Sequence, residues 1–155
     1  QEGLPLRLRL TVSQVSGDSC RPLVGAQVDI WHCNAEGDYS DVTANDTVGR
    51  MFLRGYQVTD DNGVVEFTTI YPGWYRGRTV HIHFKVRSDS LEFTSQLNFD
   101  EEITEAIYAE NPYSERGIPD TTNAQDNIFN EDTLLTLTPE GDGYLGTFDI
   151  GLRMS

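Results

Sequence analysis

Hydrophobic and polar residues alternate along several short stretches of this chain. Between Leu4 and Val12 every second residue is Leu or Val, and the residues between them are Pro, Arg or Thr. A period of two is typical of a strand with one buried face, so this segment is predicted to form a strand. Comparable stretches predict further strands over residues 26–33, 51–59, 64–69, 79–87, 92–99, 134–138 and 144–150.

Turn-forming residues separate the expected strands and indicate which of them pair. The segment 60–63 ends in Asn62-Gly63, the dipeptide that favours a two-residue hairpin turn. Two later pairs of strands are separated by polar or glycine-rich segments at 88–90 and 139–143. We therefore expect hairpins at all three places. Short strands with frequent turns predict an all-β fold, a β-sandwich of mixed topology with one short helix and long loops.

The one stretch with a helical pattern follows the expected strand 92–99. Asp100 is a candidate N-cap for a helix over 101–110, with Ile103 and Ile107 on one face. Acidic residues near the start of this segment would interact favourably with the helix dipole. The polar segment 111–132 that follows is expected to be a long ordered loop.

Length and charge narrow the range of functions. The chain has 155 residues, which suits one hydrophobic core, and we expect a single domain spanning residues 1–155. Its formal net charge of -14 argues against binding nucleic acid or an anionic membrane surface, because both require clustered Lys and Arg. No apolar run approaches the roughly 20 residues needed to cross a bilayer.

The two cysteines bear on the cellular compartment. A disulfide between Cys20 and Cys33 would close a loop of about 14 residues and stabilise the fold by about 3 kcal/mol. We expect this disulfide, and with it a secreted protein, because disulfides persist in oxidising compartments. The alternative is two unrelated, small buried residues. The chain begins with Gln1, which fits a processed product, and residues 45–47 (Asn-Asp-Thr) match a glycosylation triplet.

Two of the three histidines lie in one expected strand. Alternation along the strand 79–87 places His81 and His83 on the same face, close enough to share a metal ion. The third histidine, His32, follows Trp31 and is either a further ligand or a buried core residue. The opposite face of the strand, toward the core, carries Val80, Ile82, Phe84 and Val86.

Tyrosines near this histidine pair suggest which metal ion it would bind. Tyr71 and Tyr75 precede the pair, whereas the only acid within six residues of it is Asp89. A phenolate is a hard, anionic oxygen ligand and favours Fe(III), while a typical zinc or ferrous site would use a carboxylate, a Cys pair or a third His. Each tyrosine taken singly is equally compatible with an amphipathic residue at the edge of the core.

Several ordered blocks of sequence extend this pattern. Together they resemble the signatures of the intradiol ring-cleavage dioxygenases, such as catechol 1,2-dioxygenase and protocatechuate 3,4-dioxygenase, and especially the secreted, cysteine-containing branch of that family. The resemblance covers roughly residues 20–125. The blocks are 22–40, which contains Trp31-His32-Cys33-Asn34 and Tyr39; 52–60; 71–83, which contains Tyr71-Pro72-Gly73-Trp74-Tyr75 and His81-Ile82-His83; and 94–100, which contains Gln96.

The resemblance implies a complete iron site. It implies a non-heme Fe(III) ion with four protein ligands, and a reaction in which O2 opens a catechol-type ring between its hydroxyl-bearing carbons to give a cis,cis-muconate-type product. Tyr71 matches no ligand position and is expected to be structural. The implied ligands are Tyr39, Tyr75, His81 and His83.

The resemblance also assigns roles around the substrate. Tyr75 is expected to act in catalysis by accepting a substrate proton when catechol displaces it. Arg78 is expected to face the bound ring and stabilise its developing negative charge, with Gln96 as its partner in the substrate pocket. The N-terminal helical region through which catechol 1,2-dioxygenases dimerise is missing from this sequence, so we expect a monomer or a weak homodimer.

Two other functions are compatible with the residue patterns alone. One is a non-catalytic extracellular β-sandwich that binds catechol compounds or glycans, because sandwich folds serve many binding functions. The other is a zinc hydrolase that uses His32, His81 and His83 as ligands. Colour and metal content separate these three functions, since only tyrosinate bound to Fe(III) would make the protein red-brown.

Overall fold

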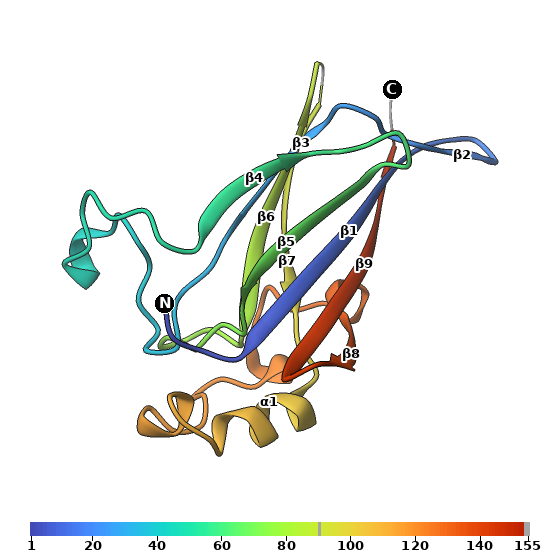
Figure 1. The fold of residues 1–155 in the computed structure, drawn as a ribbon. Helices are drawn as coiled ribbons and strands as arrows, with labels where there is room; N and C mark the ends of the chain where they lie inside the picture. Colours follow the sequence, from blue (N-terminus) through green and yellow to red (C-terminus); the bar gives the residue numbers. More distant parts are fainter. Residues whose placement is uncertain (90, 154–155) are drawn as a thin grey trace.

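Two β-sheets pack against each other in the computed structural model, which describes residues 1–89 and 91–153 (Figure 1). Ser90, part of the expected turn 88–90, lies outside the described residues. One sheet has the strand order β2-β1-β9-β8, with β5 also paired to β1, and the other has the order β4-β3-β6-β7. The strands are β1 (Pro5–Ser16), β2 (Ser19–Pro22), β3 (Gln27–Trp31), β4 (Arg54–Val58), β5 (Val64–Ile70), β6 (His81–Ser88), β7 (Leu91–Asn98), β8 (Thr136–Glu140) and β9 (Gly143–Arg153).

The first sheet combines parallel and antiparallel pairs. Strand β1 runs antiparallel to β5, with Leu8 opposite Phe67, and parallel to β9, with Leu8 opposite Gly146. The other sheet is antiparallel throughout its described pairs. The all-β class and the mixed topology expected from the sequence are therefore confirmed. The short strand β2, which pairs with the end of β1, was not expected.

The expected hairpin between residues 51–59 and 64–69 is wrong. The turn itself forms, because the backbone N–H of Gly63 donates to the carbonyl of Asp60 at 2.9 Å. However, β4 pairs with β3 in one sheet, and β5 pairs with β1 in the other. The two sides of the turn diverge because each bonds to a different sheet. The backbone N–H of Thr59 donates to the carbonyl of Ala26 at 2.9 Å, while the carbonyl of Gly63 accepts from the backbone N–H of Val12 at 2.8 Å. Local turn chemistry predicted the reversal but not the change of sheet.

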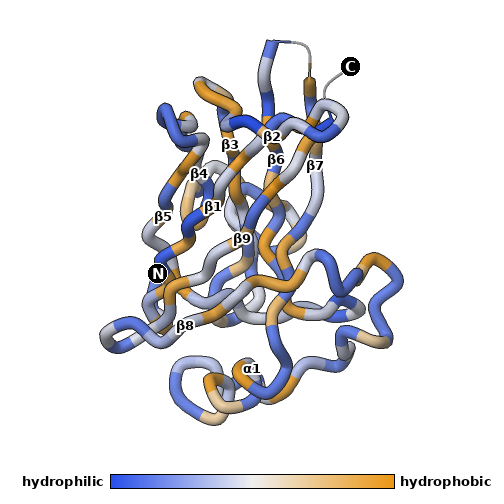
Figure 2. The backbone as a smooth tube through the Cα atoms, turned by 90° about the vertical axis from the view of Figure 1, so that its right-hand side faces the viewer, coloured by the Kyte–Doolittle hydropathy of each residue, from blue (hydrophilic) through white to orange (hydrophobic). Residues whose placement is uncertain are grey.

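The other two hairpins agree with the sequence pattern. Strands β6 and β7 pair antiparallel, as do β8 and β9. Hydrophobic and hydrophilic residues alternate along the strands (Figure 2), and the hydrophobic ones meet in the core between the sheets. Completely buried residues of the core include Leu6, Leu8, Leu10, Val12, Val28, Ile82, Val86 and Leu97.

The helix α1 (Glu101–Tyr108) lies at one end of the sandwich (Figure 1). Asp100 caps it as expected, since its side chain accepts a hydrogen bond from the backbone N–H of Ile103 at 3.1 Å. The segment after α1 contains three short 3-10 turns at the same end. These turns are η2 (Tyr113–Glu115), η3 (Asn123–Gln125) and η4 (Glu131–Thr133), while η1 (Thr43–Asn45) lies in the loop between β3 and β4.

The expected disulfide between Cys20 and Cys33 is wrong. Both cysteines are free, Cys20 exposed on β2 and Cys33 buried just after β3. Cys20 lies opposite Val15 on β1, whereas His32, next to Cys33, bonds to Thr69, which lies opposite Leu6. Measured along β1, Cys20 therefore lies at the position of Val15 and Cys33 near that of Leu6. These positions are nine residues apart, roughly 30 Å along the strand. A disulfide requires Cα atoms within about 7 Å of each other. Among the described residues, no helix is long and apolar enough to cross a membrane.

Candidate metal centre and substrate site

Strand β6 carries the histidine pair where it enters the sheet. Its core-facing residues Ile82 and Phe84 are buried at 0% and 2% exposure, so His81 and His83 project from the opposite face. This alternation is the one expected from the sequence. His81 is itself 2% exposed, because loops from other parts of the chain cover this end of the sheet.

Two tyrosines reach the histidine pair from separate loops. The hydroxyl of Tyr75 lies 3.0 Å from Nε2 of His81, and the hydroxyl of Tyr39 lies 3.1 Å from Nε2 of His83. The two Nε2 atoms are 3.1 Å apart. Four potential ligand atoms, two phenolic oxygens and two imidazole nitrogens, thus converge on one point. They come from positions separated by up to 44 residues in the sequence.

The protonation of this cluster favours metal binding. Nδ1 of His81 donates to the carbonyl of Thr79 at 2.6 Å, which leaves the Nε2 lone pair directed at the cluster. Burial lowers the pKa of His81 to about 4 and that of His83 to about 3, so both imidazoles are neutral near pH 7. Burial raises the pKa of Tyr39, so its phenolate form requires a cation at this point. The donor set fits a hard, trivalent metal ion.

The Tyr39 loop is fixed by short polar side chains. The backbone N–H of Tyr39 donates to Oδ1 of Asn45 at 3.1 Å, and its carbonyl accepts from the hydroxyl of Thr47. The same hydroxyl accepts from the backbone N–H of Val42 at 3.1 Å. Residues 45–47, which match a glycosylation triplet, therefore hold the backbone of a candidate ligand.

The Tyr75 loop packs directly on the segment that precedes Tyr39. The backbone N–H of Gly73 donates to the carbonyl of Asn34 at 3.0 Å. A Cβ atom at Gly73 would overlap the carbonyl oxygens of Asn34 and Ala35. Only a residue without a side chain permits this approach, which sets the separation of the two tyrosine loops. The neighbouring Trp74 is fixed by Arg116, whose Nε donates to its carbonyl at 2.7 Å.

The remaining aromatic residues near the site are structural. Trp31 stacks on His83 with ring centroids 5.1 Å apart and nearly parallel planes. Tyr71 is completely buried, and its hydroxyl bonds to that of Thr104 at 2.6 Å. It lies in the core, as expected, and not among the four converging side chains.

His32 is not placed to bind a metal ion. Its Nδ1 lies 2.7 Å from the carbonyl of Cys33 and its Nε2 lies 2.8 Å from the hydroxyl of Thr69, so both ring nitrogens have partners. No group of three or more His, Cys, Asp or Glu side chains in residues 1–89 and 91–153 is arranged to hold a metal ion. The structure therefore gives no support to a zinc site built from three histidines.

Arg78 and Gln96 lie beside the converging side chains. Gln96 is opposite His83 on β7, and its Oε1 accepts from Nη2 of Arg78 at 2.5 Å. The amide nitrogen of Gln96 donates to Asn98 at 3.1 Å, so the orientation of the side chain is defined. The guanidinium is only partly exposed, which makes its charge effective over short distances.

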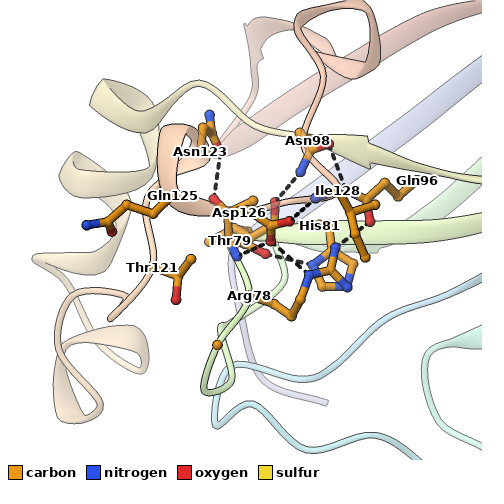
Figure 3. A network of polar contacts seen from close by, with 12 residues as sticks. Arg78, Thr79, His81, Gln96, Asn98, Thr121, Asn123, Gln125, Asp126 and Ile128 are labelled. Atoms are coloured by element: carbon orange, nitrogen blue, oxygen red, sulfur yellow. Dashed lines mark hydrogen bonds and ion pairs between the residues drawn. The ribbon is translucent and has the colours of Figure 1, made fainter.

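Asp126 is a further residue of this site that the sequence did not reveal. It lies in the loop after α1, and its Oδ2 accepts from Nε of Arg78 at 2.8 Å (Figure 3). The sequence around it is polar and turn-rich, like the rest of segment 111–132, and no local pattern distinguishes it. Only the tertiary fold brings this loop against the start of β6.

Comparisons with known proteins identify the family of this chain. A family model described as "Dioxygenase" matches residues 1–127. Catechol 1,2-dioxygenase of Candida albicans is 32% identical over 134 residues, which cover 74% of this chain and 41% of that protein. Chlorocatechol 1,2-dioxygenase of Pseudomonas putida is 32% identical over 115 residues, 62% of this chain and 42% of that protein. The chain thus spans about two-fifths of the length of these curated relatives.

Solved structures are similar over nearly the whole chain. An intradiol ring-cleavage dioxygenase from Tetranychus urticae superposes with a TM-score of 0.89 at 29% identity, covering 99% of this chain and 82% of that chain. The dioxygenase domain of a carbohydrate-binding protein fusion from Streptomyces sp. SirexAA-E has a TM-score of 0.75, also at 29% identity and with the same coverage.

Proposed function

Because the chain belongs to the intradiol dioxygenase family, we propose that it cleaves catechol-type rings with O2 between the two hydroxyl-bearing carbons. Both oxygen atoms of O2 would enter the product, a cis,cis-muconate-type diacid. The observation that carries this proposal is the convergence of two phenolic oxygens and two imidazole nitrogens beside an arginine.

We propose that the metal ion is a non-heme Fe(III) ion held by both phenolic oxygens and both Nε2 atoms. Phenolate ligands stabilise the trivalent state, and when bound the ion would supply the Lewis acidity that binds and activates the catechol. The stacking of Trp31 on His83 and the bond from His81 to Thr79 fix the two imidazole rings before any metal ion binds. The proposed ligands are Tyr39, Tyr75, His81 and His83.

Tyr75 has a second task in this proposal. A catechol must lose two protons to chelate a metal ion, and a phenolate that leaves its position can accept one of them at its oxygen. Tyr75 lies on the same short loop as Gly77, whose positive φ of 85° allows a sharp change of direction before Arg78. Tyr39, in contrast, is held at its backbone by Asn45 and Thr47 and is proposed to stay in place.

Arg78 and Gln96 are proposed to act on the ring. The ring carbons that bear the oxygens must carry partial negative charge as O2 attacks, and a guanidinium that is always protonated stabilises that charge. The bond between Nη2 of Arg78 and Oε1 of Gln96 orients the guanidinium before the substrate arrives. Pre-orientation is effective because no reorganisation is needed during the reaction.

The direct test measures iron, colour and product in the same preparation. Purified protein should contain one iron per chain and show a red-brown tyrosinate-to-iron absorption band that shifts when catechol is added. Tyr39→Phe and Tyr75→Phe should weaken or move this band, whereas Tyr56→Phe, at an exposed tyrosine 60% accessible on β4, should not. Oxygen uptake with formation of a muconate-type product from catechol completes the assay.

Two results would overturn the proposal. A colourless protein that retains zinc, or a protein without metal that binds catechol unchanged, would exclude iron-dependent cleavage. An iron band unaffected by both tyrosine variants would show that the iron is bound elsewhere.

We further propose, from the family resemblance alone, that the protein is secreted and acts as a monomer or weak homodimer. The free cysteines remove one argument for secretion, since no disulfide joins them. Fractionation of the producing cells, and light scattering of the purified protein at several concentrations, test these two points separately.

A further inference from the structure

The contacts of Asp126 set the environment of the guanidinium beside the proposed iron site. The side chain of Asp126 is 1% exposed, and its Oδ2 accepts from both Nε of Arg78, at 2.8 Å, and the backbone N–H of Thr79, at 2.9 Å. Its Oδ1 accepts from the backbone N–H of Ile128 at 2.8 Å. Figure 3 shows Asp126 between its own loop and the first residues of β6. Among the described residues, it is the one carboxylate that is buried.

These contacts keep Asp126 ionised. Burial alone would raise the pKa of Asp126, but hydrogen bonds from Arg78 and from two backbone N–H groups outweigh burial and lower it. An arginine guanidinium carries a positive charge in proteins. The two side chains therefore form a pair with no net charge, in which Asp126 is buried and Arg78 is half-buried.

The loop that carries Asp126 is itself anchored to the start of β6. The hydroxyl of Thr79 donates to Oδ1 of Asn123 at 2.5 Å, and the amide of Asn123 donates to the carbonyl of Phe99 at 3.0 Å. Asp126 is thus delivered by a segment that is tied to both β6 and the end of β7. Its position relative to Arg78 is determined by the fold and not by the exposed loop surface.

The pairing limits what Arg78 can do for a substrate. Nε is used by Asp126, and Nη2 is used by Gln96, which leaves the other N–H groups free to face a bound ring. A neutral ion pair attracts a distant anion only as a dipole, and the buried carboxylate repels an anionic group that approaches Arg78. The formal net charge of -14 acts in the same direction.

We infer that Asp126 is a positioning and specificity-determining residue: it holds Arg78 toward the ring and cancels its charge, so that the site selects catechols with uncharged ring substituents over catechols that carry a carboxylate. This inference rests on the proposed function, because it concerns the substrate of the same site. It assigns the selection to one carboxylate on a loop that supplies none of the proposed metal ligands.

The test compares two substrates that differ only in the substituent at one ring position, which is neutral in one and negatively charged in the other. 4-Methylcatechol and protocatechuate (3,4-dihydroxybenzoate) carry a methyl and a carboxylate group at equivalent carbons. Dissociation constants are measured from the shift of the visible band under anaerobic conditions, and kcat/KM is measured separately from oxygen uptake. The wild-type protein should bind 4-methylcatechol more tightly than protocatechuate.

Two variants should change this preference in opposite directions. Asp126→Asn keeps the side-chain shape but removes the charge. The preference for the neutral ligand should then fall at least about tenfold, since a nearby negative charge repels a carboxylate strongly at low effective dielectric. Arg78→Gln leaves the buried carboxylate without its partner, so the preference should rise. Asp132→Asn, at an exposed carboxylate farther along the same loop, is the matched control and should leave the preference unchanged.

Binding preference separates a specific role from a purely structural one. A general loosening of the loop would weaken both ligands together, whereas loss of charge changes their ratio. Asp126→Asn is compared only if it folds, as judged by its melting curve and iron content. If it does not fold, the inference is tested by whether the preference for the neutral ligand rises in Arg78→Gln. The inference is overturned if the wild-type protein binds both ligands equally, or if the ratio moves in the same direction in both variants. Absence of turnover with every catechol would instead count against the proposed function.

Discussion

The hydrogen bonds of the Thr47 hydroxyl, which we call the Thr47 clamp, provide a test of how the loop positions the proposed ligand Tyr39. Thr47 is 4% exposed, and its hydroxyl donates to the carbonyl of Tyr39 while accepting from the backbone N–H of Val42 at 3.1 Å. Thr47→Val replaces the hydroxyl by a methyl group of nearly the same size, so it removes both hydrogen bonds without opening a cavity. The variant therefore isolates the polar contribution of the clamp.

The expected effect follows from these two bonds. Losing either bond leaves one backbone group, the carbonyl of Tyr39 or the N–H of Val42, without its partner. Each lost hydrogen bond to a half-buried group costs about 1 kcal/mol. Together the two losses destabilise the arrangement in which Tyr39 faces His83 by about 2 kcal/mol. The free energy of iron binding is then reduced by the same amount, because part of it must restore this arrangement. Since about 1.4 kcal/mol corresponds to a factor of ten, iron affinity should fall about 30-fold.

The assay is a competition titration of iron against a chelator, followed at the tyrosinate-to-iron band. Thr43→Val, in the exposed turn η1, is the control, because the described residues show no hydrogen bond from the Thr43 side chain. The control should bind iron like the wild-type protein. Unchanged iron affinity in Thr47→Val would refute the reasoning, since it would show that the loop does not need this clamp to present Tyr39.

Three further predictions test other parts of the structure. Arg78→Ala should retain iron but lose about 2 to 4 kcal/mol of transition-state stabilisation, measured as a fall in kcat/KM for catechol; full turnover would exclude its role. Gly73→Ala should lower the melting temperature and the iron content together, because a Cβ there overlaps the backbone of Asn34; an unchanged protein would contradict the close approach of the two loops. A thiol reagent should label Cys20 alone in the native protein, and Cys33 only after denaturation, because Cys33 is buried and burial raises its pKa to about 12; labelling of neither would indicate a disulfide.

Much of the fold was predictable because it depends on local periodicity. The alternation in β1 and β6 identified the strands and the buried face of each, and Asp100 identified the start of α1. These features follow from chemistry within a few residues of the chain. Strand partners were less predictable, because the same turn can join two strands that pair with each other or two strands that belong to different sheets. The turn at 60–63 forms as expected, but the strands on either side join different sheets.

In the candidate site, too, some features follow from local sequence and others depend on the tertiary fold. The spacing of His81 and His83 placed two potential ligands on one face, and the family resemblance pointed to Tyr39, Tyr75 and their neighbours. The structure brings these side chains within 3.1 Å of one another along a chain of contacts. It also shows that His32 has partners on both ring nitrogens, which the sequence had left open.

The sequence by itself determined which faces of the strands are buried and which residue types are available for metal chemistry. Periodicity and side-chain chemistry are local properties, so they can be read along the chain. Only the tertiary structure decided that Cys20 and Cys33 lie at different levels of the sandwich, and that Asp126 meets Arg78 across 48 residues. Such contacts depend on how sheets and loops pack over long sequence separations, and no short stretch of sequence specifies that packing.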